Sequence, residues 1–330
     1  MQHNKTSIIA FLAIAAITLF ALLGTPIKKD FPLEEVRIAV STTPLSAPFY
    51  VAKEQGFFEE SGVAATLVEM AGGAKCFSEM ISGNVELATI SNSVVMFNSF
   101  QYNNFSVLGS FVESDNDIKL FARTEDNHPA TIHNLVGKNI GVVKGSASEY
   151  FLHSLLITSG IEPDKVIRVP LNVDKMPEAL EQHTVDAISV WEPFAYQTHK
   201  HNQQAAQVDA KGLYNLSFVL AGKRDSSEAQ IQIRTKVLQA LNKATHFIAS
   251  NPKQAQAILR SHLQLDQEFI DWIWQDYLFK LSLNNSLVTS LENQARWAVE
   301  SNLVTHEQIP SFQEFIDHAP LSKVDDISAF

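Results

Sequence analysis

The sequence predicts an α/β protein with two similar lobes, because strand and helix patterns alternate along the chain and recur after about 100 residues. Apolar, β-branched runs typical of strands alternate with stretches of helical spacing. In the first part of the chain these segments fall at 36–40, 47–55, 64–70, 73–82, 85–90 and 94–100. Such alternation predicts βαβ units, in which parallel strands form a sheet that helices cover.

The second lobe is predicted from a weak internal repeat. Gly83–Ala88 matches His183–Ile188 at an offset of 100 residues, and the run 36–40 matches 138–142 at an offset of 102. From Ser227 onward the chain has mostly helical spacing. A crowded aromatic stretch lies there and contains Trp272, Trp274, Tyr277 and Phe279. We interpret it as a helix that packs on the first lobe, with an aromatic ligand site as the alternative.

The composition limits the classes of protein to which this chain can belong. The chain has 330 residues, 45% of them hydrophobic, which suits a globular protein of one large domain or two lobes. Its formal net charge of −11 argues against nucleic acid or anionic lipid as a partner, because both need a cationic surface. The single cysteine, Cys76, excludes an intramolecular disulfide, and we expect it to be a buried small side chain.

The N-terminus carries the signature of export. Lys5 precedes an uncharged, mostly apolar run from Ser7 to Gly24, and Lys28 and Lys29 follow. Residues 1–30 are therefore predicted to be a cleaved signal peptide or an uncleaved membrane anchor at 7–24. Either one exports the rest of the chain to the periplasm. No cysteine directly follows the run, which excludes a lipoprotein anchor.

Four predicted loops follow the carboxyl ends of strands, where open parallel sheets bind their ligands. Two loops come from each lobe, so they converge on one cleft if the lobes face each other. The candidate ligand-binding residues are Ser41, Thr42, Thr43, Ser91, Asn92, Ser93, Lys144, Gly145, Ser146, Trp191 and Glu192.

Three of these loops, 41–43, 91–93 and 144–146, are rich in Ser, Thr, Asn and Gly, and each precedes a predicted helix. A helix N-terminus exposes unpaired N–H groups and partial positive charge, so these loops favour an anion. Gly145 would let the backbone approach the ligand closely, and Lys144 would add a full positive charge. The alternative is that these residues only cap their helices.

The fourth loop has a different chemistry. Trp191 would form an apolar wall beside the ligand, and Glu192 would pair with a ligand amine or another N–H donor. The alternative for Glu192 is a negative charge at a helix N-terminus beside Pro193. His199 and His201 are expected to face solvent rather than hold a metal. The sequence contains no P-loop, nucleophile elbow or HExxH motif, so we predict no catalytic residue, metal or cofactor.

Several ordered stretches resemble one known family. They are 48–58 (Pro-Phe-Tyr-Val-Ala-Lys-Glu-Gln-Gly-Phe-Phe), 135–142 followed by 144–146, 179–187, and 191–193 (Trp-Glu-Pro). Together they resemble the nitrate, sulfonate, taurine and thiamine-pyrimidine family of periplasmic binding proteins, the SsuA/THI5-like group. The resemblance implies a type II periplasmic-binding-protein fold, with two α/β lobes around a central ligand cleft and a double crossover between them. It places lobe I at 31–117 and 222–330, and lobe II at 118–221.

The resemblance also implies a function. The chain would be the solute-binding component of an ABC importer, with permease and ATPase subunits as partners, and would capture a small anionic or zwitterionic molecule. A membrane-anchored sensor of the same ligand is one alternative. A thiamine-pyrimidine synthase-like enzyme is another, with Lys144 as the candidate lysine for pyridoxal phosphate.

Overall fold

The computed structural model describes residues 32–124, 130–305 and 308–324. The described residues from Glu34 onward form one compact unit. The predicted signal peptide or anchor, residues 1–30, lies outside the described residues. Within the part of the chain that is described, no helix is both long and apolar enough to cross a bilayer.

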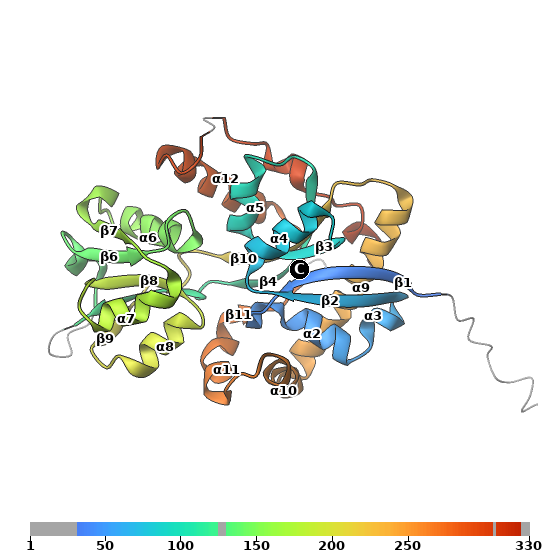
Figure 1. The fold of residues 1–330 in the computed structure, drawn as a ribbon, viewed down its shortest axis with the longest axis horizontal. Helices are drawn as coiled ribbons and strands as arrows, with labels where there is room; N and C mark the ends of the chain where they lie inside the picture. The colour runs from blue at the N-terminus through green and yellow to red at the C-terminus, as the bar shows by residue number, and fades with distance from the viewer. Residues whose placement is uncertain (1–31, 125–129, 306–307, 325–330) are drawn as a thin grey trace, which may run out of the picture. The chain divides into compact units, whose positions relative to one another are not determined.

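A six-stranded mixed sheet forms the first lobe (Figure 1). Its strands, in spatial order, are β11 (Tyr277–Leu278), β4 (Phe105–Ser114), β10 (Leu216–Lys223), β3 (Leu87–Ser91), β1 (Glu34–Ser41) and β2 (Val63–Met70). β1 runs parallel to β2 and β3, as the predicted βαβ units require. β10 and β11 pair antiparallel to their neighbours, so the sheet is mixed.

Helices cover both faces of this sheet (Figure 1). One face carries α2 (Ala47–Glu54), α3 (Phe57–Glu60), α9 (Glu228–Ser250), α10 (Pro252–Leu263) and α11 (Gln267–Ile273). The other face carries α4 (Gly73–Ser82), α5 (Asn92–Ser99) and α12 (Asn285–Glu300). α4 shows why these segments fold as they do, because its apolar Cys76, Phe77 and Met80 have helical spacing and are all buried. The prediction that Cys76 is a buried side chain is confirmed.

A five-stranded mixed sheet forms the second lobe. Its strands, in spatial order, are β7 (Ile167–Pro170), β6 (Asn139–Val142), β8 (Ala187–Trp191), β5 (Ile118–Arg123) and β9 (Ala205–Val208). Its helices are α6 (Ala147–Thr158), α7 (Met176–Glu181) and α8 (Phe194–His201). β6 is parallel to β7 and β8. β8 therefore has the same position in this sheet as β3 has in the first, where it is parallel to β1. The predicted α/β fold with two lobes and two crossovers is confirmed.

The chain leaves the first sheet between β4 and β5 and returns between β9 and β10. The boundary expected at 117/118 falls in the first of these connections. The boundary expected at 221/222 falls inside β10 and needs correction, because this strand pairs with both β3 and β4 of the first sheet from Leu216 onward. The second crossover is therefore the segment 209–215.

The aromatic stretch 272–279 also differs from its prediction. α11 ends at Ile273, a short 3-10 helix spans Trp274–Asp276, and Tyr277 begins β11. Trp272, near the end of α11, donates a hydrogen bond to Glu192 of the second lobe, and Tyr277 donates one to Asp117 in the first crossover.

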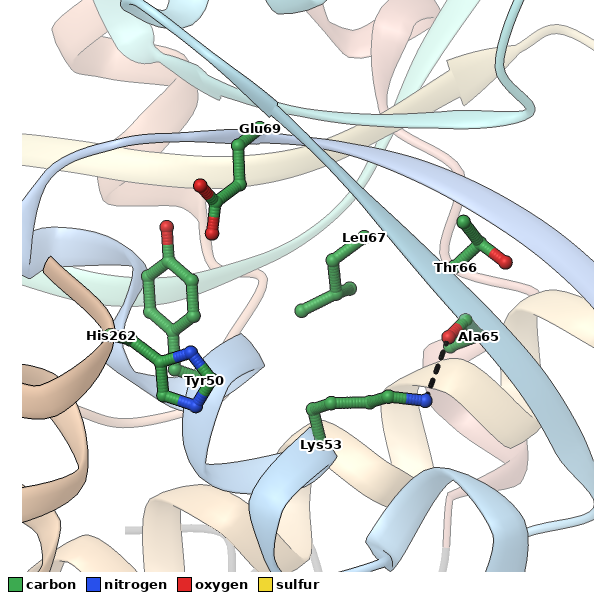
Figure 2. A pocket seen from close by; sticks show the side chains of 7 residues that line it. All are labelled: Tyr50, Lys53, Ala65, Thr66, Leu67, Glu69 and His262. Carbon is green, nitrogen blue, oxygen red and sulfur yellow. Dashed lines mark hydrogen bonds between the residues drawn. The ribbon is translucent and has the colours of Figure 1, made fainter.

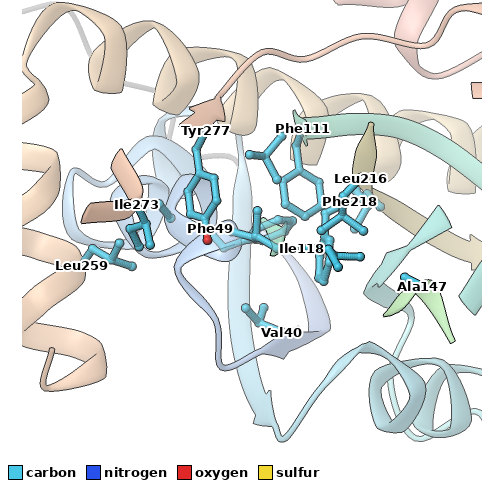
Figure 3. Packing of buried hydrophobic residues seen from close by; sticks show 14 of the residues in the cluster. Val40, Phe49, Phe111, Ile118, Ala147, Leu216, Phe218, Leu259, Ile273 and Tyr277 are labelled. Atoms are coloured by element: carbon cyan, nitrogen blue, oxygen red, sulfur yellow. The ribbon is translucent and has the colours of Figure 1, made fainter. Parts of the chain in front are cut away.

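One apolar cluster continues from the first lobe into the second (Figure 3). In the first lobe Phe49 of α2 packs edge-on against Phe111 of β4, with ring centroids 4.9 Å apart. Ile118 of β5 and Ala147 of α6 belong to the same cluster. The two lobes therefore share one apolar cluster beside the crossovers, and this cluster holds the ends of the two sheets next to each other.

Candidate ligand-binding site

The loop 41–43 is anchored by its own hydrogen bonds at the carboxyl end of β1. The Ser41 backbone N–H donates to Thr89 Oγ1 of β3 at 2.9 Å. Thr42 donates to the Met70 carbonyl through both its backbone N–H (2.9 Å) and its hydroxyl (3.1 Å). The Thr43 backbone N–H donates to the Ser41 carbonyl at 2.8 Å. This loop therefore joins the ends of β1, β2 and β3 on the side facing the second lobe.

The loop 91–93 begins α5 as a helix cap. Ser91 Oγ accepts from the Val94 backbone N–H at 3.4 Å, and it lies 3.0 Å from Ser93 Oγ. Both serine side chains are nine-tenths buried. Hydroxyls both donate and accept, so this pair can turn toward a ligand oxygen while Ser91 keeps its cap.

Asn92, between the two serines, is fully buried and has a structural role. Its Oδ1 accepts from the Tyr214 hydroxyl at 2.9 Å and from the Ser93 N–H at 3.1 Å. Its Nδ2 donates to the Asn215 carbonyl and to Ser290 Oγ at 3.3 and 3.4 Å. Since every polar atom of this side chain bonds to the protein, Asn92 ties β3 to the second crossover and to α12.

The loop 144–146 begins α6 and already holds a negative charge. Ser146 caps the helix by accepting from the Ser148 N–H at 3.2 Å. Gly145 has a φ of +64°, and its N–H donates to Glu149 Oε2 at 2.8 Å. A carboxylate at this position satisfies the donors and the positive end of the helix dipole. A ligand anion would have to compete with Glu149 here, whereas Lys144 is exposed beside it.

Two of the predicted loops, one from each lobe, meet through tyrosines. The Tyr214 ring, held by Asn92, lies edge-on to Tyr150 of α6, with centroids 5.6 Å apart. Tyr150 lies one turn after Ser146, so α5 and α6 present their N-termini to the same region. Burial raises the pKa of Tyr214 well above its usual value, so this hydroxyl stays protonated and donates to Asn92.

The loop 191–192 is bound to both lobes. Glu192 is almost fully buried, and its Oε1 accepts from Lys119 Nζ at 2.8 Å and from the Trp272 indole N–H at 2.7 Å. Its Oε2 accepts from the Tyr196 backbone N–H at 2.9 Å, which is the helix N-terminal position that the alternative interpretation gave it. Trp191 is partly buried and pairs in register with Ile118 of β5. Glu192 thus bonds to the chain itself in this structure.

Lys119 lies at the centre of a buried polar network at the crossovers. Besides Glu192, its Nζ lies 3.6 Å from Asp276 Oδ2 and bonds to the Asn116 carbonyl. The Tyr277 hydroxyl donates to Asp117 Oδ1 at 2.7 Å, and the Asp117 carboxyl is buried. This burial raises the pKa of Asp117 to about 7, against the lowering effect of the Tyr277 hydrogen bond.

Sequence reasoning missed Lys119, Asp117 and Tyr214, although one of them left a signal. Lys119 is the single charge in the apolar run 118–122, and a charge inside a buried strand requires a partner. Ser46 was also missed; its hydroxyl is fully buried just after the loop 41–43 and has no hydrogen-bond partner among the described residues.

α8 and α11 form a second contact between the lobes. The His199 ring stacks on Trp272 at 4.3 Å, and Tyr196 packs against Phe269 at 5.2 Å. His199 is exposed, as expected, and its ring also contacts the first lobe through Trp272. No cluster of three or more His, Cys, Asp or Glu side chains suited to a metal occurs among the residues described.

A surface hollow of about 310 Å³ lies on the first lobe between α2, β2 and α10 (Figure 2). Its lining residues are Tyr50, Lys53, Ala65, Thr66, Leu67, Glu69 and His262. Figure 2 shows the Tyr50 hydroxyl pointing toward Glu69, and the ring stacks on His262 with centroids 5.2 Å apart. None of the residues predicted for the ligand site lines this hollow.

Replacing Tyr50 with Phe should leave the free energy of unfolding unchanged or raise it by about 1 kcal/mol. The Tyr50 hydroxyl is buried without a hydrogen-bond partner, so its removal relieves a desolvation cost while the ring remains. Tyr214→Phe is the matched control and should lower the unfolding free energy by about 1–2 kcal/mol, because it removes a buried hydrogen bond. Urea unfolding measures both; equal losses would mean that the Tyr50 hydroxyl has a partner in solution.

Known proteins are similar to this chain in sequence and in fold. A Bacillus subtilis protein whose name proposes that it binds aliphatic sulfonates is 26% identical over 247 residues, 72% of this chain and 73% of that protein. The periplasmic aliphatic sulphonate binding protein SsuA from Escherichia coli has the same fold, with a TM-score of 0.75 and 19% identity over 86% of this chain and 97% of SsuA. The desulfurization enzyme DSZB also shares the fold, with a TM-score of 0.64 and 14% identity over 88% of this chain and 98% of DSZB.

The family itself is identified by sequence. The profile of the family described as NMT1/THI5 like matches residues 43–255, which include three of the four predicted loops in full and Thr43 of the fourth. The match covers more than half of the chain and confirms the resemblance stated from the sequence. The two lobes, their double crossover and this match together establish that the chain belongs to the NMT1/THI5-like family.

Proposed function

We propose that this chain is the solute-binding component of an ABC importer and captures a small anionic or zwitterionic organic molecule, such as a sulfonate or taurine, between its lobes. Nitrate, an inorganic anion, is a smaller candidate ligand. The observation that carries the proposal is the meeting of α5 and α6, one helix N-terminus from each lobe, through Asn92, Tyr214 and Tyr150. The sulfonate-binding relatives support the ligand class.

The partners follow from this role. Loaded protein would deliver its ligand to a membrane permease that is driven by a cytoplasmic ATPase. Residues 1–30 would export the chain to the periplasm, and the segment 7–24 would anchor it to the membrane if it is not cleaved. We propose no nucleic-acid partner, because the net charge is −11.

The charges around the two helices favour a zwitterion. At α5 the ligand would meet the hydroxyls of Ser91 and Ser93, which can donate to sulfonate oxygens. At α6 it would meet Glu149, whose carboxylate holds the Gly145 N–H and suits a ligand ammonium group. An anionic end at the first lobe and a cationic end at the second would let one molecule bridge the lobes and favour their closure.

The surroundings of Lys119 and Lys144 favour binding rather than catalysis. DSZB shows that the fold also serves an enzyme. In this chain Lys119 is held in a buried ion pair with Glu192, and Lys144 lies exposed on its loop. We therefore propose no catalytic residue and no cofactor, and keep the thiamine-pyrimidine synthase-like enzyme as the alternative that pyridoxal phosphate binding would favour. A sensor of the same ligand would bind without supporting uptake through a permease.

Taurine should raise the melting temperature of the chain by several degrees, and ethanesulfonate should raise it less. A ligand at 100 times its Kd stabilises by about 2.7 kcal/mol. The difference between these two probes should disappear in Glu149→Gln, which keeps the hydrogen bond to Gly145 but removes the negative charge. Glu178→Gln, at an exposed position on α7, is the control for charge alone.

The same thermal-shift screen includes nitrate, small carboxylates, pyrimidines and pyridoxal phosphate. A shift with pyridoxal phosphate alone would favour the enzyme. No shift with any sulfonate or carboxylate would reject the proposed ligand class.

A further inference from the structure

Buried polar atoms without hydrogen-bond partners gather where α12 of the first lobe meets α6 of the second. They are Trp297 Nε1 and Gln294 Oε1 on α12, His153 Nδ1 on α6, and Arg168 Nε. Trp297 is 2% exposed and Gln294 is fully buried. The rings of His153 and Trp297 lie 6.3 Å apart, and the Arg168 charge near His153 adds to burial in lowering its pKa. Buried polar atoms in proteins are almost always paired, so a cluster of unpaired ones requires an explanation.

Aromatic rings line the same contact. Trp297 lies 5.2 Å from the ring of Tyr150, 6.3 Å from that of His153 and 6.2 Å from that of Phe97. Tyr150 also meets Tyr214, which bonds to Asn92 at the start of α5. We call Phe97, Tyr150, Tyr214 and Trp297 the aromatic seam. It connects the start of α5, through Tyr214 and Tyr150, to Trp297 of α12.

Packing alone accounts for the rings but not for the unpaired atoms. Trp297 also belongs to the buried cluster of the first lobe, and the partly buried Phe97 packs against that cluster, which explains their burial. If α12 and α6 never separated, the protein would be more stable with a hydrogen-bond partner for the Trp297 N–H, or with an apolar side chain at position 297. A contact that opens to admit a ligand keeps such donors and acceptors for the ligand.

We propose that the aromatic seam binds the body of the ligand, and that this body contains an unsaturated ring. This inference rests on the proposed function. The anionic group of the ligand lies at Ser91 and Ser93, its ring lies between Tyr150 and Trp297, and the Trp297 N–H donates to an acceptor on the ring. Aromatic rings attract one another through face and edge contacts beyond the effect of buried area, so the seam discriminates between a flat ring and a saturated one.

The test compares three sulfonates on the full chain by isothermal titration calorimetry: benzenesulfonate, cyclohexanesulfonate and methanesulfonate. The first two have the same charge and ring size, and the cyclohexyl ring is the more apolar. Benzenesulfonate should nevertheless bind about 5-fold more tightly than cyclohexanesulfonate, and methanesulfonate should bind most weakly. Pyridine-3-sulfonate, which adds a ring acceptor, should gain affinity over benzenesulfonate.

Three variants test which residues cause the preference for an unsaturated ring and the gain from a ring acceptor. Tyr150→Leu should abolish the preference for the unsaturated ring, and Trp297→Phe should keep that preference but lose the gain from pyridine-3-sulfonate. Tyr102→Leu is the control, because Tyr102 packs on Phe77 at the surface of the first lobe. It should change none of the affinities.

The outcomes separate this inference from the proposed function. Equal binding of benzenesulfonate and cyclohexanesulfonate by the unmodified chain would overturn the aromatic seam as a ligand site and leave the proposed function standing. No binding of any sulfonate by the folded chain would overturn both. The comparison on the unmodified chain decides the matter even if a variant fails to fold.

Discussion

Replacing Lys119 with Met should lower the free energy of unfolding by about 3–5 kcal/mol. The Lys119 and Glu192 side chains are 2% and 1% exposed, and their charged atoms lie 2.8 Å apart. Methionine matches the length of the lysine stem but leaves Glu192 as a buried carboxylate without its cation, whereas the nearby Asp276 keeps its ion pair with Lys211. Removing one partner of a buried ion pair is costly because the other charge stays in a region that water cannot reach. Urea unfolding followed by circular dichroism measures the change.

Lys200→Met is the matched control. Lys200 also pairs with a glutamate, Glu268, at 2.6 Å, but both side chains are exposed, so its loss should leave the unfolding free energy almost unchanged. Adding Glu192→Gln to Lys119→Met should recover part of the lost stability. A small effect of Lys119→Met, comparable to that of Lys200→Met, would show that water reaches the network at the crossovers.

Asp117 should make the protein less stable as the pH rises from about 4 to about 7. Burial raises the pKa of its carboxyl to about 7, whereas an aspartate in the unfolded chain titrates near pH ~3.9. Between these values the folded state holds a proton that the unfolded state has released. The stability that this proton contributes is fully present below the unfolded pKa and is lost as the pH rises through the folded pKa.

Asp117→Asn should remove this dependence. Asparagine still accepts a hydrogen bond from Tyr277 but does not ionise. The unfolding free energy of the variant, relative to the unmodified chain, should increase by about 3 kcal/mol between pH 5 and pH 8. Asp164→Asn, at an exposed position, controls for the loss of one negative charge. Parallel pH profiles for the unmodified chain and Asp117→Asn would contradict the assignment.

The sequence predicted local features of the fold and site well, because they depend on neighbouring residues. Strand and helix alternation placed β1, β2 and β3 within a few residues of their observed bounds. Ser91 and Ser146 cap helices as their positions before apolar helical runs suggested. The ligand role of the eleven candidate residues stays a prediction. The caps formed by Ser91 and Ser146 fit both interpretations of their two loops, whereas no side chain of the loop 41–43 caps the helix that follows it.

Interactions between distant segments could not be predicted in the same way. Glu192 was predicted to bind a ligand. Its observed partners, Lys119 and Trp272, lie 73 and 80 residues away in the chain, so nothing near Glu192 in the sequence indicates them. Nothing near Tyr214 indicates that its hydroxyl bonds to Asn92, 122 residues earlier. The second crossover was placed too late for a related reason, since only pairing with β3 and β4 shows that β10 belongs to the first sheet.

The strand order of the first sheet constrains how the chain can fold as it is synthesised. β10 lies between β3 and β4, yet it is made only after the whole second lobe. The second sheet uses residues 118–208 alone, so it can form while the first still lacks its central strand. Until residue 223 emerges, β3 and β4 keep unpaired backbone edges that can join strands of other chains. The nascent first lobe is therefore the part of this protein that most needs protection by a chaperone until β10 has been made.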